Sequence, residues 1–138
     1  MGELSDDLAD TLVEAARAYF VKALPEGRYV AWVAEPDDRP GEIVGGAGIQ
    51  LRELLPRPHP AGGRLVRGPQ ALVMNVFTER AWRRRGVGEA LMREVLRWCR
   101  ANGVDSVVLH ASEDGRPLYR KLGFTPTNEM RYEGDPGV

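Results

Sequence analysis

A strand-like run followed by an arginine-rich turn and a helical pattern most constrains the fold of this 138-residue chain. The run covers residues 71–78, and the turn carries three arginines and two glycines: Arg83-Arg84-Arg85-Gly86-Val87-Gly88. A strand, a glycine-bearing turn and a helix in this order point backbone N–H groups and a helix dipole at an anion. Glycine lets the backbone approach closely, and arginine adds charge-assisted hydrogen bonds. The segment therefore predicts a pyrophosphate-binding turn.

The glycine spacing excludes two common phosphate-binding turns. A P-loop has Gly, four residues and Gly-Lys-Ser/Thr, whereas a dinucleotide-binding turn has Gly-x-Gly-x-x-Gly. Here Gly86 and Gly88 precede Glu89, Ala90 and Leu91. The pattern Arg-x-x-Gly-x-Gly after a strand resembles the coenzyme A turn of the GNAT (Gcn5-related N-acetyltransferase) family. Taken without other motifs, the segment also fits a basic helix start on a surface.

A second segment, about thirty residues further on, supports this resemblance. Residues 107–112 are typical of a strand, and residues 116–124 contain Leu-Tyr, two residues, and Leu-Gly-Phe. This segment is similar to the second GNAT motif, in the order and at the distance that the family uses. The resemblance covers roughly residues 28–133.

The resemblance implies an α/β acetyltransferase fold with a mixed, mostly antiparallel, twisted sheet flanked by helices, in one domain over residues 1–138. The family's first strand and first helix are expected to be missing from this chain. A sheet that begins at residues 28–34 has an exposed edge, and exposed edges invite pairing. We therefore expect a homodimer, unless the native chain is longer than this one.

Other elements follow from periodicity and breakers. Ser5 can cap an N-terminal helix, and residues 28–34 and 43–51 indicate a two-stranded hairpin. Three glycines in its second strand predict a bulge or the close approach of another chain or a ligand: Gly45, Gly46 and Gly48. The proline-rich residues 55–63 are expected to form a mobile loop without regular structure.

The helix after the turn has one apolar face at helical spacing: Gly88, Leu91, Met92, Val95, Leu96 and Cys99. The opposite face carries Arg93, Arg97 and Arg100, which are expected to face water. Since Cys99 lies on the apolar face, we interpret it as a buried small hydrophobe rather than a catalytic thiol. A single cysteine excludes an internal disulfide and a multi-cysteine zinc site, and it suits a reducing cytoplasm.

Charge and composition exclude further classes of function. The net charge of −1 gives no reason to expect nucleic acid, whose binding normally needs a basic face. The sequence has no run of 18 apolar residues that could span a membrane. We interpret the preference for arginine over lysine, with abundant alanine and glycine, as the codon bias of a GC-rich bacterial genome.

The resemblance implies acetyl-CoA as co-substrate, no metal, and Tyr119 as general acid. A phenol with a pKa near 10 can protonate a departing thiolate; the alternative is a core aromatic. The pantetheine arm is implied beside the end of the first strand, where a backbone N–H free of the ladder would stabilise an oxyanion; ordinary ladder bonds are the alternative. The expected cofactor-binding residues are Val76, Phe77, Thr78, Arg84, Arg85, Gly86, Val87, Gly88, Glu89 and Ser112.

The chain departs from the family pattern at several positions. Ser112 stands where the family often has an asparagine that contacts pantetheine, and Arg80 replaces a common proline. Residues 71–76 contain no carboxylate, so the general base that some members place there is missing. The sequence leaves four alternatives for the base: Glu79, His110, Glu129 or an ordered water. His59 is expected to be solvated, and His110 is as readily structural as functional.

The resemblance implies an N-acetyltransferase that acetylates a primary amine of a small molecule or peptide. The alternative is an acyl-CoA-binding regulatory or scaffold protein without turnover, and a basic interaction module without a cofactor comes third. The acceptor pocket is expected between the N-terminal helix, residues 56–63 and residues 128–130. None of these segments carries a dense charge of one sign.

Overall fold

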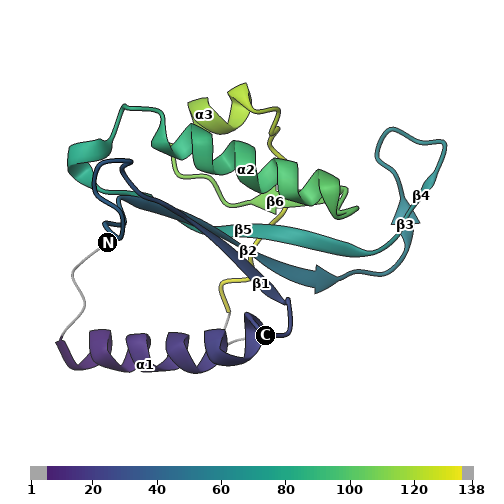
Figure 1. The fold of residues 1–138 in the computed structure, drawn as a ribbon. Coiled ribbons are helices and arrows are strands. Elements are labelled where there is room, and N and C mark those ends of the chain that lie inside the picture. Colours follow the sequence, from purple (N-terminus) through teal and green to yellow (C-terminus); the bar gives the residue numbers. More distant parts are fainter. Residues whose placement is uncertain (1–5, 135–138) are drawn as a thin grey trace.

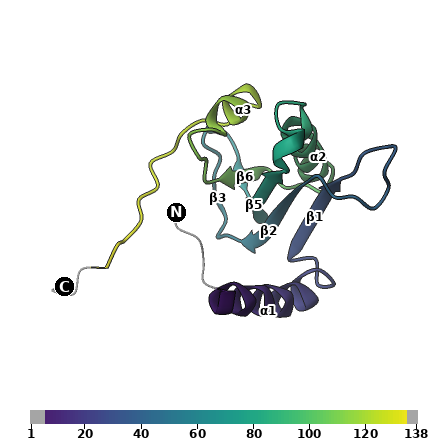
Figure 2. The same ribbon diagram turned by 90° about the vertical axis from the view of Figure 1, so that its left-hand side faces the viewer.

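The computed structural model describes residues 6–134 and contains a twisted four-stranded sheet with a long helix on each face (Figures 1 and 2). The elements in chain order are α1 (Asp6–Ala23), β1 (Tyr29–Ala34), β2 (Gly45–Glu53), β3 (Arg57–Pro58), β4 (Leu65–Val66), β5 (Pro69–Thr78), the 3-10 helix η1 (Arg80–Trp82), α2 (Val87–Ala101), β6 (Ser106–Leu109) and α3 (Arg116–Lys121). Among these described residues, no helix is long and apolar enough to cross a membrane.

The main sheet has the order β1-β2-β5-β6. β2 pairs antiparallel with both β1 and β5, whereas β5 and β6 are parallel. Parallel neighbours need a crossover connection, and α2 supplies it while covering one face of the sheet (Figure 1). The predicted mixed, mostly antiparallel sheet flanked by helices is confirmed.

The core lies between α2 and the sheet. The predicted apolar face of α2 is confirmed, because Met92 and Val95 are fully buried and Cys99 is nearly so. They pack with Ile49 of β2 and Val73 of β5, whose side chains point to the same side of their strands. Cys99 is a free thiol, and burial raises its pKa. Its protonated, buried state supports the structural role expected for it.

The second face of the sheet is covered by α1, which contacts it mainly through its C-terminal third. Ala23 is fully buried, and the ring of Phe20 lies 4.7 Å from that of Tyr29 in β1. The amide of Gln50 in β2 donates a 3.0 Å hydrogen bond to the Tyr19 hydroxyl. Towards the start of α1, by contrast, Leu12 is 55% exposed. The cap predicted at Ser5 lies outside the described residues.

The expectation of an entirely irregular segment at residues 55–63 is wrong. β3 pairs antiparallel with β4, and the His59 N–H continues this ribbon with a 2.9 Å bond to the Arg64 carbonyl. Proline is tolerated here because each strand of a two-stranded ribbon has a free edge that needs no N–H donor. His59 is not simply solvated either, since its Nδ1 accepts a 3.0 Å hydrogen bond from the Ala61 N–H.

The strand predicted at residues 107–112 is shifted and shorter. β6 begins at Ser106 and ends at Leu109. Further on, the Ser112 carbonyl accepts bonds from the N–H groups of Gly115 and Arg116, both at 3.1 Å. These bonds start the turn into α3, so the chain leaves the direction of the strand before it reaches Ser112.

The predicted β-bulge lies opposite the glycines of β2. The register shifts between Gly46 and Gly48, so that Asn75 and Val76 of β5 together face a single residue of β2. Neighbouring side chains fill the space that the glycines leave open. A Cβ on Gly48 would lie only 1.9 Å from the Tyr29 hydroxyl oxygen.

Candidate active site

The basic turn, residues 83–89, joins η1 to α2 and contains two residues in the left-handed conformation. Arg84 has φ 64° and Gly86 has φ 81°. Gly86 is also the N-cap of α2, and its carbonyl accepts the first helical bond from Ala90 at 3.0 Å. The N–H groups of Val87, Gly88 and Glu89 belong to the first helical turn, where no intrahelical acceptor exists. These donors and the positive end of the helix dipole converge at the turn.

The arginines of the turn differ in their contacts. Arg83 donates a 3.2 Å hydrogen bond to the Thr78 carbonyl, which ties the turn to the end of β5. The guanidinium of Arg85 stacks on the Trp82 ring at 4.7 Å, and Arg39 lies 5.5 Å from the centroid of the same ring. Arg84 is exposed. The turn therefore presents several positive charges around its free N–H groups.

The carboxylate of Glu89 is bound away from the turn's donors. Its Oε1 accepts a 2.6 Å bond from Lys121 Nζ, and its Oε2 accepts a 3.3 Å bond from Arg93. The hydrogen bond from Lys121 is the main reason that the pKa of Glu89 is lowered, and the bond from Arg93 adds to it. Because the cations Lys121 and Arg93 balance the negative charge of the carboxylate, the backbone N–H of Glu89 can bind an anion without strong repulsion. The bond to Lys121 also joins α2 to α3.

β5 and β6 separate beside the basic turn. Their parallel pairing extends from Gln70–Ser106 to Val73–Leu109, after which β5 continues to Thr78 paired only with β2. Val76 packs against the core, whereas the Phe77 side chain is 47% exposed on the other face and lies over Gly46. The bulge and the divergence interrupt regular pairing at the strand end where the pantetheine arm is expected.

Tyr119 is half-buried on α3, with its ring 5.9 Å from that of Phe124. Burial raises the pKa of its phenol, so the group is protonated at neutral pH. Within residues 6–134, its hydroxyl has no hydrogen-bond partner, which leaves the proton available to a bound molecule. Ser112 lies close to the same ring, but its Oγ accepts a 3.2 Å bond from the Gly115 N–H.

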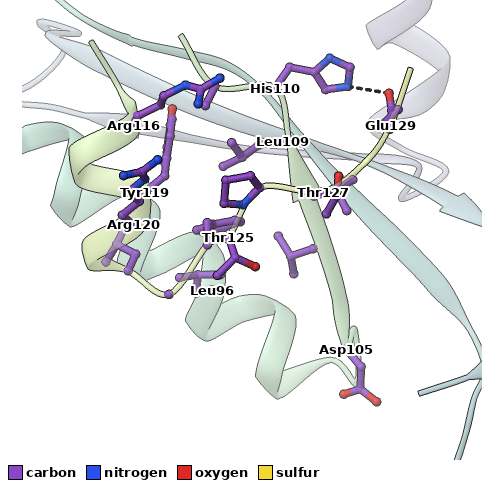
Figure 3. A pocket seen from close by; sticks show the side chains of 17 residues that line it. Leu96, Asp105, Leu109, His110, Arg116, Tyr119, Arg120, Thr125, Thr127 and Glu129 are labelled. Atoms are coloured by element: carbon purple, nitrogen blue, oxygen red, sulfur yellow. Dashed lines mark ion pairs between the residues drawn. The ribbon is translucent and has the colours of Figure 1, made fainter. Parts of the chain in front are cut away.

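The larger cavity, about 540 Å³, lies at the outer edge of β6 and not between β5 and β6. It is lined by β6, α3, Leu96 of α2 and the segment after Phe124 (Figure 3). Tyr119 lies on its wall, and His110 Nε2 and the Glu129 carboxylate lie 3.6 Å apart on its rim, with both side chains exposed. A second pocket of about 340 Å³ lies between β1 and the start of α2 and includes Gly86.

The predicted residues thus fall into two groups. The first group lies around the start of α2 and consists of the basic turn, the end of β5 and α3. The Glu89–Lys121 bond joins α2 to α3, and the Leu118 side chain lies close to Gly88. Among the bases considered, His110 and Glu129 are neighbours, whereas Glu79 directly follows β5, where its N–H bonds the Val44 carbonyl. No group of three potential metal ligands occurs among the described residues.

Sequence reasoning missed two features of the site. One is the stack of two arginines on Trp82, which links the loop between β1 and β2 to the basic turn. The other is Asn75, which has φ 59° and donates a 2.8 Å hydrogen bond to the Tyr29 hydroxyl. Asparagine is one of the few residues that tolerate this conformation, and that was its only signal in the sequence.

Comparison with known proteins identifies the family. Residues 3–124 match the sequence model of the "Acetyltransferase (GNAT) family". A GCN5-related N-acetyltransferase from Ralstonia eutropha JMP134 is similar in structure, with 29% identity, TM-score 0.77, and coverage of 94% of this chain and 80% of that one. A predicted acetyltransferase from Clostridium acetobutylicum, crystallised with acetyl-CoA, has the same fold at 22% identity and TM-score 0.76, with coverage of 97% and 79%.

A curated relative, glucosamine 6-phosphate N-acetyltransferase from Trypanosoma brucei brucei, is 33% identical over 84 residues. The match covers 61% of this chain and 52% of the relative, so the chain spans about half the length of that protein. The family match covers most of the sequence, and it agrees with the motifs on both sides of α2. The chain belongs to the acetyltransferase (GNAT) family.

Proposed function

We propose that this enzyme moves an acetyl group from acetyl-CoA to a primary amine of a small molecule or a peptide. The observation that carries the proposal is the basic turn, in which left-handed Arg84 and Gly86 precede the free N–H groups of α2. A Cβ on Gly86 would meet no atom within 4 Å, so the turn leaves room for an anion to approach its backbone. Turns of this kind bind pyrophosphate.

The proposed binding residues form a path from this turn to α3. The pyrophosphate would contact the turn, and the pantetheine arm would run between the end of β5 and the start of α3. The residues proposed for these contacts are Val76, Phe77, Thr78, Arg84, Arg85, Gly86, Val87, Gly88, Glu89 and Ser112. The local bond of Ser112 to Gly115 leaves its hydroxyl proton free to donate to a carbonyl of the arm.

The protein must stabilise the oxyanion, protonate the leaving thiolate and accept a proton from the amine. The acceptor amine attacks the thioester carbonyl, and a backbone N–H at the end of β5 would stabilise the negative oxygen, which is worth a few kcal/mol at the transition state. Tyr119 would then give its proton to the departing thiolate. Its raised pKa supports this role, because the phenol stays protonated until it is needed.

The amine must also lose a proton, and the geometry favours the pair at the rim of the cavity for this step. His110 and Glu129 lie 3.6 Å apart, and a carboxylate beside an imidazole can hold it in the orientation to accept a proton. The cavity that they border is shared with Tyr119 (Figure 3). We propose His110 as the base, with an ordered water between it and the amine.

The acceptor is proposed to bind on the side of the sheet that carries α1. Glucosamine 6-phosphate belongs in the set of amines to be tested, because a relative with 33% identity bears that name. A homodimer is also proposed, since β1 is one of the two edge strands of the described sheet and edge strands favour pairing. Light scattering tests the dimer: a monomer at high concentration that still binds coenzyme A rejects it.

Calorimetry with coenzyme A tests the assignment of the basic turn. Gly86→Val places a branched residue at φ 81° in the proposed phosphate site and should weaken binding by at least about 100-fold. Gly103→Val is the matched control, because Gly103 is also left-handed, with φ 71° and open space around it, but follows the opposite end of α2. Equal affinity in the parent and Gly86→Val, or equal losses in the two variants, would contradict the proposal.

A further inference from the structure

The bulge at the end of β5 contains an asparagine at a position that usually takes glycine. In bulges of this type, two residues of one strand face a single residue of the partner strand. The first of the two is left-handed, and glycine is preferred there because it has no Cβ. Asn75 has φ 59° at this position and is followed by Val76. A left-handed residue with a side chain costs free energy, so such a residue persists only where its surroundings hold it.

The Tyr29 hydroxyl provides the contact that holds Asn75. The Asn75 side-chain amide donates a 2.8 Å hydrogen bond to it, across the intervening strand β2. Tyr29 itself is only 4% exposed, and its hydroxyl occupies the space above Gly48 that the side chain of any other residue at position 48 would fill. Because Gly48 borders the register shift, the hydroxyl is held directly over the bulge.

Tyr29 also contacts the helix on the acceptor side of the sheet. Its ring lies 4.7 Å from that of Phe20 and 6.3 Å from that of Tyr19. A buried ring with these neighbours has little freedom to move, so its hydroxyl is a fixed acceptor for the Asn75 amide. The bulge is therefore connected through one side chain to α1.

We propose that Asn75 and Tyr29 are positioning residues that set the direction of the backbone N–H groups following Asn75, at Val76 and Phe77. The inference rests on the proposed function, in which one of these groups stabilises the oxyanion of the thioester. A rotation at residue 75 would turn the following peptide planes away from the carbonyl. The pair acts on the reaction through the backbone and contacts neither substrate directly.

Two single variants and their combination test the pair. Asn75→Gly removes the amide but keeps a residue at ease in the left-handed conformation, and Tyr29→Phe removes only the hydroxyl. Ser106→Ala is the control, because it deletes another half-buried side-chain hydrogen bond of β5, the 2.9 Å bond from Gln70, at the opposite end of the strand. All four proteins are compared with the parent in full-length form.

The expected result is a loss of turnover without a loss of cofactor binding. Each single variant should lower kcat by about 10- to 100-fold, as misplaced catalytic groups do, and the double variant should lower it no further. The affinity for coenzyme A, measured by calorimetry, should stay within about twofold because the basic turn is untouched. Ser106→Ala should retain the parental kcat.

Infrared spectroscopy of bound acetyl-CoA, labelled with ¹³C at the carbonyl, gives a second readout. In the parent, a hydrogen bond from the bulge should lower the stretching frequency of the carbonyl, and Asn75→Gly and Tyr29→Phe should reverse this shift. Parental kcat and frequency in both variants would overturn the inference while leaving the proposed function intact.

Failure of the proposed function would be visible in the parent, as no acetyl transfer to any amine. Amide hydrogen exchange at residues 74–78 then decides the inference, since it needs no substrate. Faster exchange in both single variants than in Ser106→Ala would support the pair's control of the bulge, and unchanged exchange would reject it.

Discussion

Tyr119→Phe separates the chemical role of the phenol from its role in packing. Phenylalanine keeps the ring that lies 5.9 Å from Phe124, and the lost hydroxyl has no partner among the described residues. The free energy of unfolding at neutral pH should therefore change by less than about 0.5 kcal/mol. The loss of a general acid, by contrast, should lower kcat by about 10²- to 10⁴-fold, which corresponds to about 3 to 5 kcal/mol at the transition state.

The assay is release of the coenzyme A thiol at saturating acetyl-CoA and amine, with calorimetry to show that the cofactor still binds. Phe124→Leu is the matched control, because it removes the ring contact and keeps the hydroxyl. It should change stability more than Tyr119→Phe and turnover far less. A parental rate in Tyr119→Phe, or equal losses of rate in both variants, would show that Tyr119 is only a core aromatic.

The pH dependence of stability gives an independent check on Tyr119. Its pKa is raised by burial, so the folded state holds the proton more tightly than the unfolded state. Below the unfolded pKa, about 10, both states are protonated and this difference has no effect. Above it, the parent should lose stability as pH rises towards the folded pKa, and Tyr119→Phe should lack that part of the loss. Chemical denaturation at several alkaline pH values measures the difference.

Three further predictions concern the scaffold. Gly48→Ala places a Cβ 1.9 Å from the Tyr29 hydroxyl and should destabilise the fold by about 1–3 kcal/mol, as overpacking does, in thermal unfolding. Lys121→Met should raise the pKa of Glu89 towards its ordinary value, measurable by carboxyl NMR, and an unchanged pKa would contradict the bond between α2 and α3. Cys99, 2% exposed, should react with a thiol reagent only as fast as the protein unfolds; rapid labelling would show that α2 is not packed as described.

The fold was predictable because its strongest signals are local. The basic turn, the apolar face of α2 and the Leu-Tyr and Leu-Gly-Phe pattern each follow from the spacing of a few residues, and the structure has the helices and the parallel strand pair that they imply. The same reasoning failed at residues 55–63, because the two residues of β3 are held by pairing with β4, which lies beyond the proline-rich run. Proline content alone cannot report such a pairing.

The details of the site were less accessible to sequence. The pair of Asn75 and Tyr29 joins positions that are 46 residues apart, and neither residue belongs to a motif. The stack on Trp82 likewise depends on Arg39, in a loop whose path the sequence does not specify. A spacing rule reports neighbours along one helix or strand, whereas these contacts arise where separate strands and loops meet.

The one-sided attachment of α1 has a consequence for how such an enzyme changes its acceptor. The helix is joined to the sheet near Tyr19, Phe20 and Ala23, while residues nearer its start, such as Leu12 and Val13, remain largely exposed. Segments with few buried contacts open at a lower free energy than the rest of a protein. In the proposed binding mode, substitutions in the first turns of α1 would reshape the acceptor side at little cost to the packing between α2 and the sheet. Selectivity and folding would then be encoded in separate parts of the chain, so that one could change without loss of the other.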